Sequence, residues 1–221
     1  MAKVLITAIA YYLVCGLIFF LSAGRTDLPV AWCYFIVNFA VGVALAIVLQ
    51  IRNPSLLQER LKPGPGDRDR LFRSVGTLLY MAAILIAGLD VGRCHWSRPI
   101  SALLQISAVL LTLLGLAILS WAMLANRYFS SAVRLQPDRQ QVVETAGPYG
   151  FVRHPGYTGG ILYFLLSGLA LGSWWASVAS LPLLPLIVRR TLVEDAMLRE
   201  GLSGYAEYAE KVRYRLIPGV W

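Results

Sequence analysis

The chain has 221 residues, of which 57% are hydrophobic and 14% are charged. An ordinary soluble domain carries about 25% charged residues, so this composition is typical of a protein whose main solvent is lipid. The formal net charge of +8 comes from basic residues placed between apolar segments, without a groove-reading motif, which argues against nucleic-acid binding. The cysteines Cys15, Cys33 and Cys94 are widely spaced and predict neither a disulfide framework nor a metal site.

Apolar segments recur along the chain, and a bilayer needs roughly 20 apolar helical residues to be crossed. The segments predict helices at 4–23, 30–50, 74–92, 100–125, 157–172 and 174–190. The first is too long for a signal peptide and is predicted to be a span. The last two are short and are joined at Gly172 and Ser173, which predicts a tight spanning hairpin or a re-entrant loop. The sequence therefore predicts an all-α, polytopic integral membrane helix bundle of about six hydrophobic helices with a tight C-terminal hairpin.

Basic residues are distributed unevenly between the loops. They concentrate in the segments 51–73, 126–156 and 189–221. The opposite loops hold only Arg25, Arg93 and Arg98. Because cytoplasmic loops carry an excess of Lys and Arg, we expect a multi-pass protein whose N- and C-termini are both cytoplasmic.

The segment 51–73 is rich in proline and glycine, which predicts a cytoplasmic loop with one short interfacial helix at about 56–61. Gly64 and Gly66 form a G-x-G pattern, but no strand precedes them and no third glycine follows. A dinucleotide-binding fingerprint is therefore rejected.

A run of turn-forming residues, 147–157, comes directly before the fifth apolar segment. Pro155 disfavours helical geometry at His154, so we expect the nearby backbone amides to be available to a ligand. The alternative is a simple turn whose Arg153 and His154 contact lipid phosphates.

Arg190 and Glu194 are four residues apart, which places them one turn apart on the same face of a helix. They could form a simple ion pair at a helix end. However, they lie where a membrane helix ends, and they would face the 147–157 turn if the last two apolar segments fold back on each other. Near a membrane, charged groups that cannot reach water by snorkelling are costly and usually functional. The following residues, 191–212, predict an amphipathic helix that Gly201 and Gly204 interrupt.

These patterns together resemble the isoprenylcysteine carboxyl methyltransferase family and its phospholipid methyltransferase relatives, over roughly residues 126–221. The motifs occur in the family's order: Arg153-His154-Pro155-x-Tyr157, an apolar hairpin, Glu194-Asp195, Gly204-Tyr205-x-x-Tyr208 and Arg213-x-Arg215-x-x-Pro218. The order and spacing of all the motifs are more specific than any one of them. One departure is that the acidic pair is Glu194-Asp195 rather than two glutamates, which puts the role of Asp195 in doubt.

The resemblance implies a methyltransferase that uses S-adenosylmethionine, with a catalytic region at 126–221 after membrane helices of unassigned function at 1–125. It implies a cytoplasmic cofactor pocket formed by Gln136, Gln141, Val142, Val143, Glu144, Tyr149, His154, Pro155, Gly156, Tyr157 and Glu194. Glu194 would accept hydrogen bonds from the cofactor's ammonium group, and Arg190 would hold the acceptor, so Arg190, Glu194 and His154 are the predicted catalytic residues. The expected acceptor is the carboxylate of a lipid-like or prenylated substrate that enters from the bilayer.

Other functions remain open at this point. The acceptor could be a phospholipid or another small hydrophobic molecule. A nicotinamide-dependent membrane reductase is a second possibility, because sterol reductases share a similar C-terminal region, and Arg134 or Arg139 could then contact a 2′-phosphate. A non-enzymatic scaffold or carrier is a third, although the first four spans lack the mid-span charge that a translocation path would need. The pair Gly42 and Ala46 is too weak a contact pattern to predict an oligomeric state.

Overall fold

The computed structural model describes residues 2–62 and 70–221, and all regular secondary structure in these two ranges is helical. The α-helices are α1 (Ala2–Ala23), α2 (Pro29–Arg52), α3 (Pro54–Leu61), α4 (Arg70–Leu89), α5 (Ala102–Ala125), α6 (Pro155–Ala170), α7 (Trp174–Ser180), α8 (Leu183–Gly201) and α9 (Tyr205–Lys211). A π-helical turn, η1 (Asp90–Cys94), extends α4, and two short 3-10 turns, η2 (Pro137–Arg139) and η3 (Gly147–Gly150), lie between α5 and α6. The predicted all-α class is confirmed.

The first four predicted spans correspond to α1, α2, α4 and α5, and the predicted interfacial helix corresponds to α3. Asn53 caps α3, because its side chain accepts a hydrogen bond from the amide of Leu56 and Pro54 occupies the first helical position. The predicted turn residues 63–66 lie outside the described residues.

The predicted helix at 174–190 is wrong in its extent. The first helix of this region, α7, ends at Ser180, and α8 begins at Leu183 and continues to Gly201. Pro182 interrupts the helical run because proline lacks a backbone N–H, whereas Pro185 is tolerated in the first turn of α8. The predicted amphipathic helix at 191–212 is therefore the second half of α8 followed by α9. Gly204 separates these two helices with a left-handed φ of 80°.

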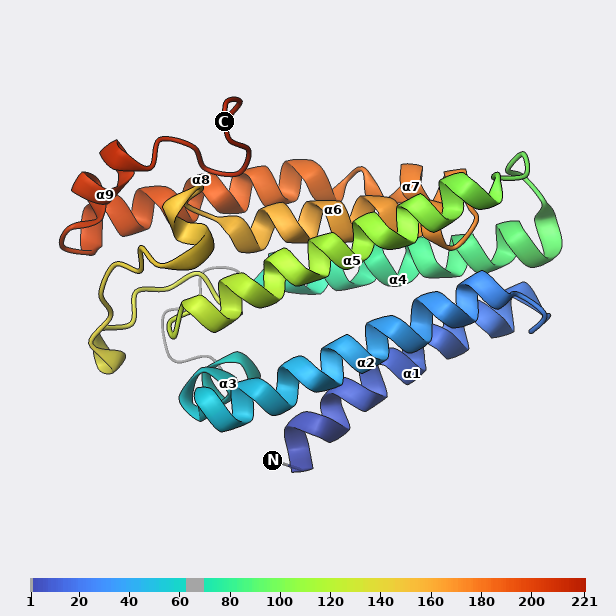
Figure 1. Cartoon of the computed structure of the whole chain (residues 1–221), viewed down its shortest axis with the longest axis horizontal. Coiled ribbons are helices and arrows are strands. Elements are labelled where there is room, and N and C mark those ends of the chain that lie inside the picture. The colour runs from blue at the N-terminus through green and yellow to red at the C-terminus, as the bar shows by residue number, and fades with distance from the viewer. Residues whose placement is uncertain (1, 63–69) are drawn as a thin grey trace.

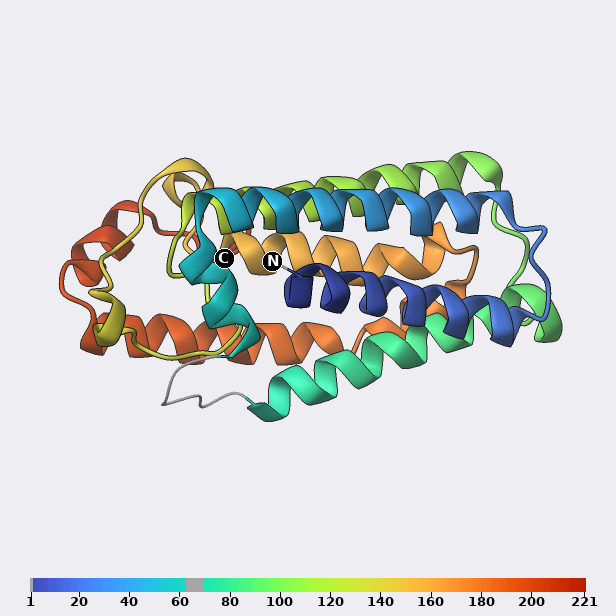
Figure 2. The same ribbon diagram turned by 90° about the horizontal axis from the view of Figure 1, so that it is seen from below.

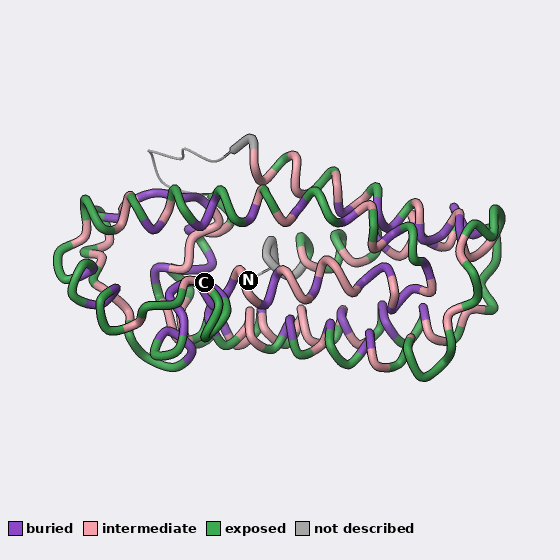
Figure 3. The backbone as a smooth tube through the Cα atoms, turned by 90° about the horizontal axis from the view of Figure 1, so that it is seen from above, coloured by how far each residue is buried: buried purple, intermediate pink, exposed green. Residues whose placement is uncertain are grey.

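The exterior of the helices is apolar, as a lipid-facing surface requires. Leu103 is 78% exposed and Leu21 is 70% exposed, and the exposed stretches alternate with buried ones along each helix (Figure 3). Among the described residues, the segments long and apolar enough to cross a bilayer are Ile6–Ala23, Pro29–Arg52, Phe72–Cys94, Ala102–Ala125 and Trp174–Gly201, the last of which comprises α7 and α8. An apolar surface of this extent is not expected on a soluble monomer. The protein is therefore an integral, multi-pass membrane protein.

The long helices run along a common axis (Figures 1 and 2). Helix α5 packs along α6, α1 packs against α2 and α4, and α7 packs against α4 and α6. The N-terminus, α3 and α9 lie toward one end, and the connections α1–α2 and α4–α5 lie at the other (Figure 1). The α6–α7 turn lies beside the C-terminal end of α4. Ser173 Oγ in this turn donates to the carboxylate of Asp90, the residue directly after α4, at 2.5 Å. The hairpin thus extends as far as α4 does. Which end is cytoplasmic stays a prediction.

Helices α5 and α6 approach each other closely at two glycines. A Cβ atom at Gly115 would lie 2.7 Å from the Gly159 carbonyl oxygen, and one at Gly159 would lie 2.4 Å from the Gly115 carbonyl oxygen. Small residues at membrane helix interfaces permit such backbone contact. This contact fixes the position of α6, whose N-terminal end forms part of the site described next.

Buried hydroxyl groups connect α2, α4 and α6 inside the bundle. Tyr34 Oη lies 2.7 Å from Ser167 Oγ and 3.2 Å from Tyr80 Oη, and Tyr80 Oη lies 3.0 Å from Tyr163 Oη. Polar groups without access to water need such partners. The network therefore lets three helices carry polar side chains in the core without unsatisfied hydroxyls.

Candidate active site

The turn before α6 is closed by the C-terminal segment. His154 has φ −127° and ψ 60°, outside the helical region that a following proline disfavours, and Pro155 begins α6. The expectation that the nearby amides are available to a ligand is wrong. The amide of Arg153 donates to the carbonyl of Tyr214 at 2.9 Å, and the amide of His154 donates to the carbonyl of Arg215 at 2.9 Å. Both amides are therefore used to attach the C-terminal segment to the turn.

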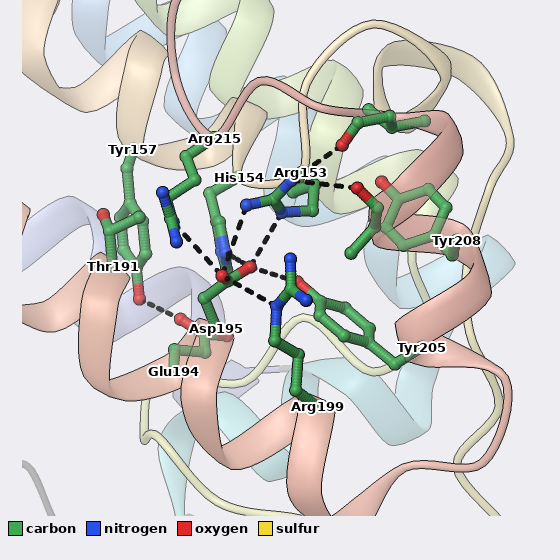
Figure 4. Close-up of polar contacts among 12 residues, drawn as sticks. Arg153, His154, Tyr157, Thr191, Glu194, Asp195, Arg199, Tyr205, Tyr208 and Arg215 are labelled. Atoms are coloured by element: carbon green, nitrogen blue, oxygen red, sulfur yellow. Dashed lines mark hydrogen bonds and ion pairs between the residues drawn. The ribbon is translucent and has the colours of Figure 1, made fainter. Parts of the chain in front are cut away.

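Asp195 is the centre of a buried ionic cluster (Figure 4). It is 2% exposed, and Arg153 donates to it through Nε at 2.8 Å and Nη2 at 3.2 Å. Tyr205 Oη donates at 3.0 Å and Arg215 Nε at 3.1 Å, while His154 Nε2 lies 3.4 Å from Oδ1. Burying a carboxylate is costly unless charged partners surround it. Asp195 thus joins α8, α9, the turn and the C-terminal segment. Because Arg153 is buried in this cluster, its alternative role as a contact to lipid phosphates is excluded.

Tyr157 links the two residues that the sequence singled out on α8. Its hydroxyl donates to Glu194 Oε2 and accepts a hydrogen bond from Arg190 Nε at 2.6 Å. Arg190 Nη2 also donates to the carbonyl of Ser131 at 2.8 Å. The His154 ring stacks on Tyr157 with a centroid separation of 5.8 Å. The chain therefore folds back so that the His154 turn meets the α8 carboxylate, with a tyrosine hydroxyl between Glu194 and Arg190.

A cavity of about 420 Å³ lies between these elements. The predicted site residues that line it are Gln136, Gln141, Val142, Val143, Glu144, Tyr149, His154, Gly156, Tyr157, Arg190 and Glu194. Pro155 is buried at the start of α6 and is not among the lining residues. The structure thus brings the predicted residues together around one space, and their individual roles stay predictions.

The cavity extends from the α9 end of the molecule into the helix bundle. Near α9, Tyr149, Tyr205 and Tyr208 line it, and burial raises the pKa of each of these phenols, so they stay protonated at neutral pH. Further inside, apolar side chains of α6 and α8, such as Phe164 and Leu183, line the cavity beside Thr77 and Tyr80 of α4. One part of the cavity can therefore form hydrogen bonds, and another can accommodate a hydrocarbon chain.

Helix α3 and the start of α4 line the cavity, although no motif in the sequence indicates that they belong to the site. Helix α3 is held there by Arg134, which donates to Glu59 through Nε at 2.9 Å and Nη2 at 2.8 Å. Arg134 also pairs with Asp138 at 2.8 Å, and the hydrogen bonds to both carboxylates raise its pKa. This arginine is thus occupied by two carboxylates, which disfavours it as a ligand for a 2′-phosphate. The missed lining residues include Arg60, Phe72, Arg73, Tyr128 and Ser131.

Comparison with known proteins gives two findings. Residues 103–203 match the sequence model of the phospholipid methyltransferase family. The structure of a eukaryotic intramembrane Ras methyltransferase, isoprenylcysteine carboxyl methyltransferase, is similar with a TM-score of 0.50 and 16% identity, covering 97% of this chain and 85% of that chain. At this identity the likeness concerns the fold. No curated protein matches the sequence significantly.

The structural match shows that the chain has a membrane-embedded helical fold like that of the isoprenylcysteine carboxyl methyltransferase, and residues 103–203 resemble phospholipid methyltransferases. Together, these findings confirm the predicted resemblance to isoprenylcysteine carboxyl methyltransferases and their phospholipid methyltransferase relatives. They support a membrane methyltransferase.

Proposed function

We propose that this protein transfers a methyl group from S-adenosylmethionine to the carboxylate of a lipid-associated acceptor, such as an isoprenylcysteine. The observation that carries the proposal is the hydroxyl of Tyr157, which bonds to both Glu194 and Arg190 at the wall of one cavity. A carboxylate suited to a cationic cofactor and a guanidinium suited to an anionic acceptor are therefore held side by side.

The lining residues near α9 fit S-adenosylmethionine, which carries a sulfonium and an ammonium group. Glu144 and Glu194 offer carboxylates, and aromatic faces such as those of Tyr205 and Tyr208 are favourable neighbours for a cation. Glu194 would accept hydrogen bonds from the ammonium group, and the segment Gln141 to Glu144 would close the pocket together with Gln136 and Tyr149. When bound, the cofactor supplies an electrophilic methyl group.

The protein residues act mainly by positioning in this proposal. Methyl transfer to a carboxylate is an in-line displacement that needs no general base, so orientation and exclusion of water are the principal contributions. Arg190 orients the acceptor, because its planar fork matches a carboxylate better than a lysine does. Tyr157 holds Arg190 relative to Glu194, and His154 supports Tyr157 through ring stacking.

The inner, apolar part of the cavity supports an acceptor that arrives from the bilayer with a hydrocarbon chain. The match of residues 103–203 favours a phospholipid acceptor as the second candidate. Arg190 would repel an amine acceptor unless it held a neighbouring phosphate. We place the cofactor entrance, and with it both termini, on the cytoplasmic side.

The first experiment is calorimetric titration of S-adenosylmethionine into the purified protein in a neutral detergent. We expect saturable binding, and a protein that unfolds cooperatively on heating yet binds no S-adenosylmethionine contradicts the proposal. Thermal stabilisation by a nicotinamide cofactor instead would favour the reductase alternative. Labelled methyl transfer to N-acetyl-S-farnesylcysteine, giving a base-labile ester, then tests the acceptor, since a methylated amine is not released by base.

A further inference from the structure

We propose that Arg60, Arg73 and Arg190 together form a subsite for a doubly charged, phosphate-type oxyanion carried by an amphiphile in the cavity. The proposal deepens the second acceptor candidate named above, a phosphate-bearing lipid, and it rests on the proposed function only in identifying that amphiphile with the methyl acceptor. Arg60 and Arg73 lie in α3 and α4, outside the segment that carries the methyltransferase motifs.

The arginines converge on Ser131 from three helices. The Ser131 carbonyl accepts a hydrogen bond from Arg190 Nη2 at 2.8 Å and from Arg73 Nη1 at 3.4 Å. The Ser131 hydroxyl donates to the carbonyl of Arg60 at 3.1 Å. All three arginines line the cavity. Two guanidinium groups thus meet at the Ser131 carbonyl. The Arg60 guanidinium contacts the carbonyl of Phe129, two residues away on the same cavity wall.

Arg60 carries a charge that the described part of the chain does not neutralise. No carboxylate among the described residues is within ion-pair distance of it. Its guanidinium lies over the Phe129 ring at 5.4 Å, and Nη1 makes one long hydrogen bond of 3.5 Å to the Phe129 carbonyl. Burial and the charge of Arg190 lower the pKa of Arg60 to about 10, so it is still charged at neutral pH. Arg60 is partly buried, and the hydrogen bond to Phe129 uses one of the five N–H donors of its guanidinium.

The nearby carboxylates already have other partners among the described residues. Glu59 and Asp138 both pair with Arg134. Glu194 accepts from Tyr157 and belongs to the part of the cavity that we assign to the cofactor. S-adenosylmethionine has one carboxylate, which is attached to the carbon that bears the ammonium group assigned to Glu194. Its sulfonium is repelled by the charge of Arg60. The oxyanion that suits Arg60 and Arg73 is therefore a group of the second ligand.

The test compares two single-chain amphiphiles of equal length, dodecyl phosphate and dodecanoate, by calorimetric titration into the full-length protein in a neutral detergent without cofactor. At pH 8 the first is largely dianionic and the second is monoanionic. We expect the protein to bind dodecyl phosphate roughly tenfold more tightly, the scale of one additional charge-assisted hydrogen-bonded contact. Arg60→Gln should remove this preference and leave dodecanoate affinity within about threefold. Arg52→Gln, which removes an exposed charge at the end of α2, should leave the preference unchanged.

An unchanged preference in Arg60→Gln, or equal affinity for the two amphiphiles in the unmodified protein, would overturn the proposal. If the glutamine variant unfolds, Arg60→Lys is the deciding variant. It keeps the charge and should therefore retain most of the preference for dodecyl phosphate over dodecanoate. Loss of the entire preference in a folded lysine variant would mean that Arg60 acts through packing alone. Full competition of dodecyl phosphate by an equal concentration of inorganic phosphate would refute a lipid-borne anion. Since these titrations contain no S-adenosylmethionine, their result is independent of whether methyl transfer itself is observed.

Discussion

Glu194 and Asp195 are adjacent in the sequence but lie in different environments. Successive residues of an α-helix point about 100° apart, so neighbouring side chains reach different surroundings. Glu194 faces the cavity and Tyr157, whereas Asp195 is buried among Arg153, Arg215 and Tyr205. The first acid is therefore available to a ligand, and the second maintains the architecture around it.

Replacing Glu194 by Gln should weaken S-adenosylmethionine binding by about 1.5–3 kcal/mol, the scale of a charge-assisted hydrogen bond. The reason is that glutamine keeps the size of the side chain but cannot compensate the cofactor's positive charge. Calorimetry measures the change, and Glu200→Gln, at an exposed position on the same helix, is the control. Unchanged affinity in the Glu194 variant would remove this residue from the cofactor site.

Replacing Asp195 by Asn should lower the free energy of unfolding by about 3–5 kcal/mol, because it leaves the buried charge of Arg153 without its partner. Thermal or denaturant unfolding in detergent measures the loss. Arg199 is a matched control, because its side chain is 42% exposed and its contact with Asp195 is long, at 3.4 Å. Arg199→Gln should therefore cost little. Equal losses in the two variants would argue against a central role for Asp195.

Replacing Arg190 by Ala should reduce methyl transfer more than it reduces cofactor affinity, because this residue is proposed to orient the acceptor. The measurement is kcat for the acceptor beside the dissociation constant for S-adenosylmethionine. Arg190→Lys, which keeps the charge but not the planar fork, should recover only part of the rate. A variant with normal turnover and weakened cofactor binding would assign Arg190 to the cofactor instead.

Among the helices, the α5–α6 contact offers a comparison between neighbouring glycines. A Cβ at Gly159 would collide with the Gly115 carbonyl, whereas one at Gly160 would have its nearest neighbour, the Phe164 ring, at 3.7 Å. Gly159→Ala should therefore destabilise the protein by about 1–3 kcal/mol through overpacking. Gly160→Ala should be neutral or stabilising by up to about 1 kcal/mol through helix propensity. Melting temperatures in the same detergent check the order, and a more stable Gly159 variant would show that the helices separate easily.

The helices that the sequence predicted well are those whose signals are local. An uninterrupted apolar run defines α5, and the Pro155 turn defines the start of α6. The break at Pro182 has a local signal, because proline disfavours a helix interior, but the apolar composition of the whole run favoured one continuous helix. The part of α3 in the site could not be predicted either. It depends on the contact between Arg134 and Glu59, 75 positions apart in the chain, and nothing near either residue indicates the other.

The site residues also fall into two groups, those that local motifs predict and those whose roles depend on tertiary packing. The motif order placed Tyr157, Arg190 and Glu194 together correctly, because the hairpin is short and its apolar segments are evident. The role of Asp195 was not readable, since its partners come from segments whose arrangement is set by tertiary packing. The use of the Arg153 and His154 amides by the C-terminal segment was hidden for the same reason.

Across the whole molecule, the cysteines allow the predicted orientation to be tested. Cys94 is exposed at the end opposite the cavity. If both termini are cytoplasmic, a membrane-impermeant thiol reagent should label Cys94 in intact cells. In a Cys33→Ser/Cys94→Ser background, which removes both exposed cysteines, a Glu207→Cys variant on α9 should be labelled only after the membrane is permeabilised. The opposite pattern would mean that both termini are extracellular. Labelling of both positions in intact cells would contradict the placement of Cys94 and α9 on opposite sides of the membrane.

The hydroxyl of Tyr157 has one proton, which it donates to Glu194 while it accepts from Arg190. Any ligand that competes for Glu194 changes how firmly that proton is held, and therefore how strongly the oxygen attracts Arg190. Occupancy by one ligand thus alters the free energy of binding of the other, and the effect is equal in both directions because linkage between binding equilibria is reciprocal. Affinities measured for either ligand alone will consequently differ from those that govern turnover.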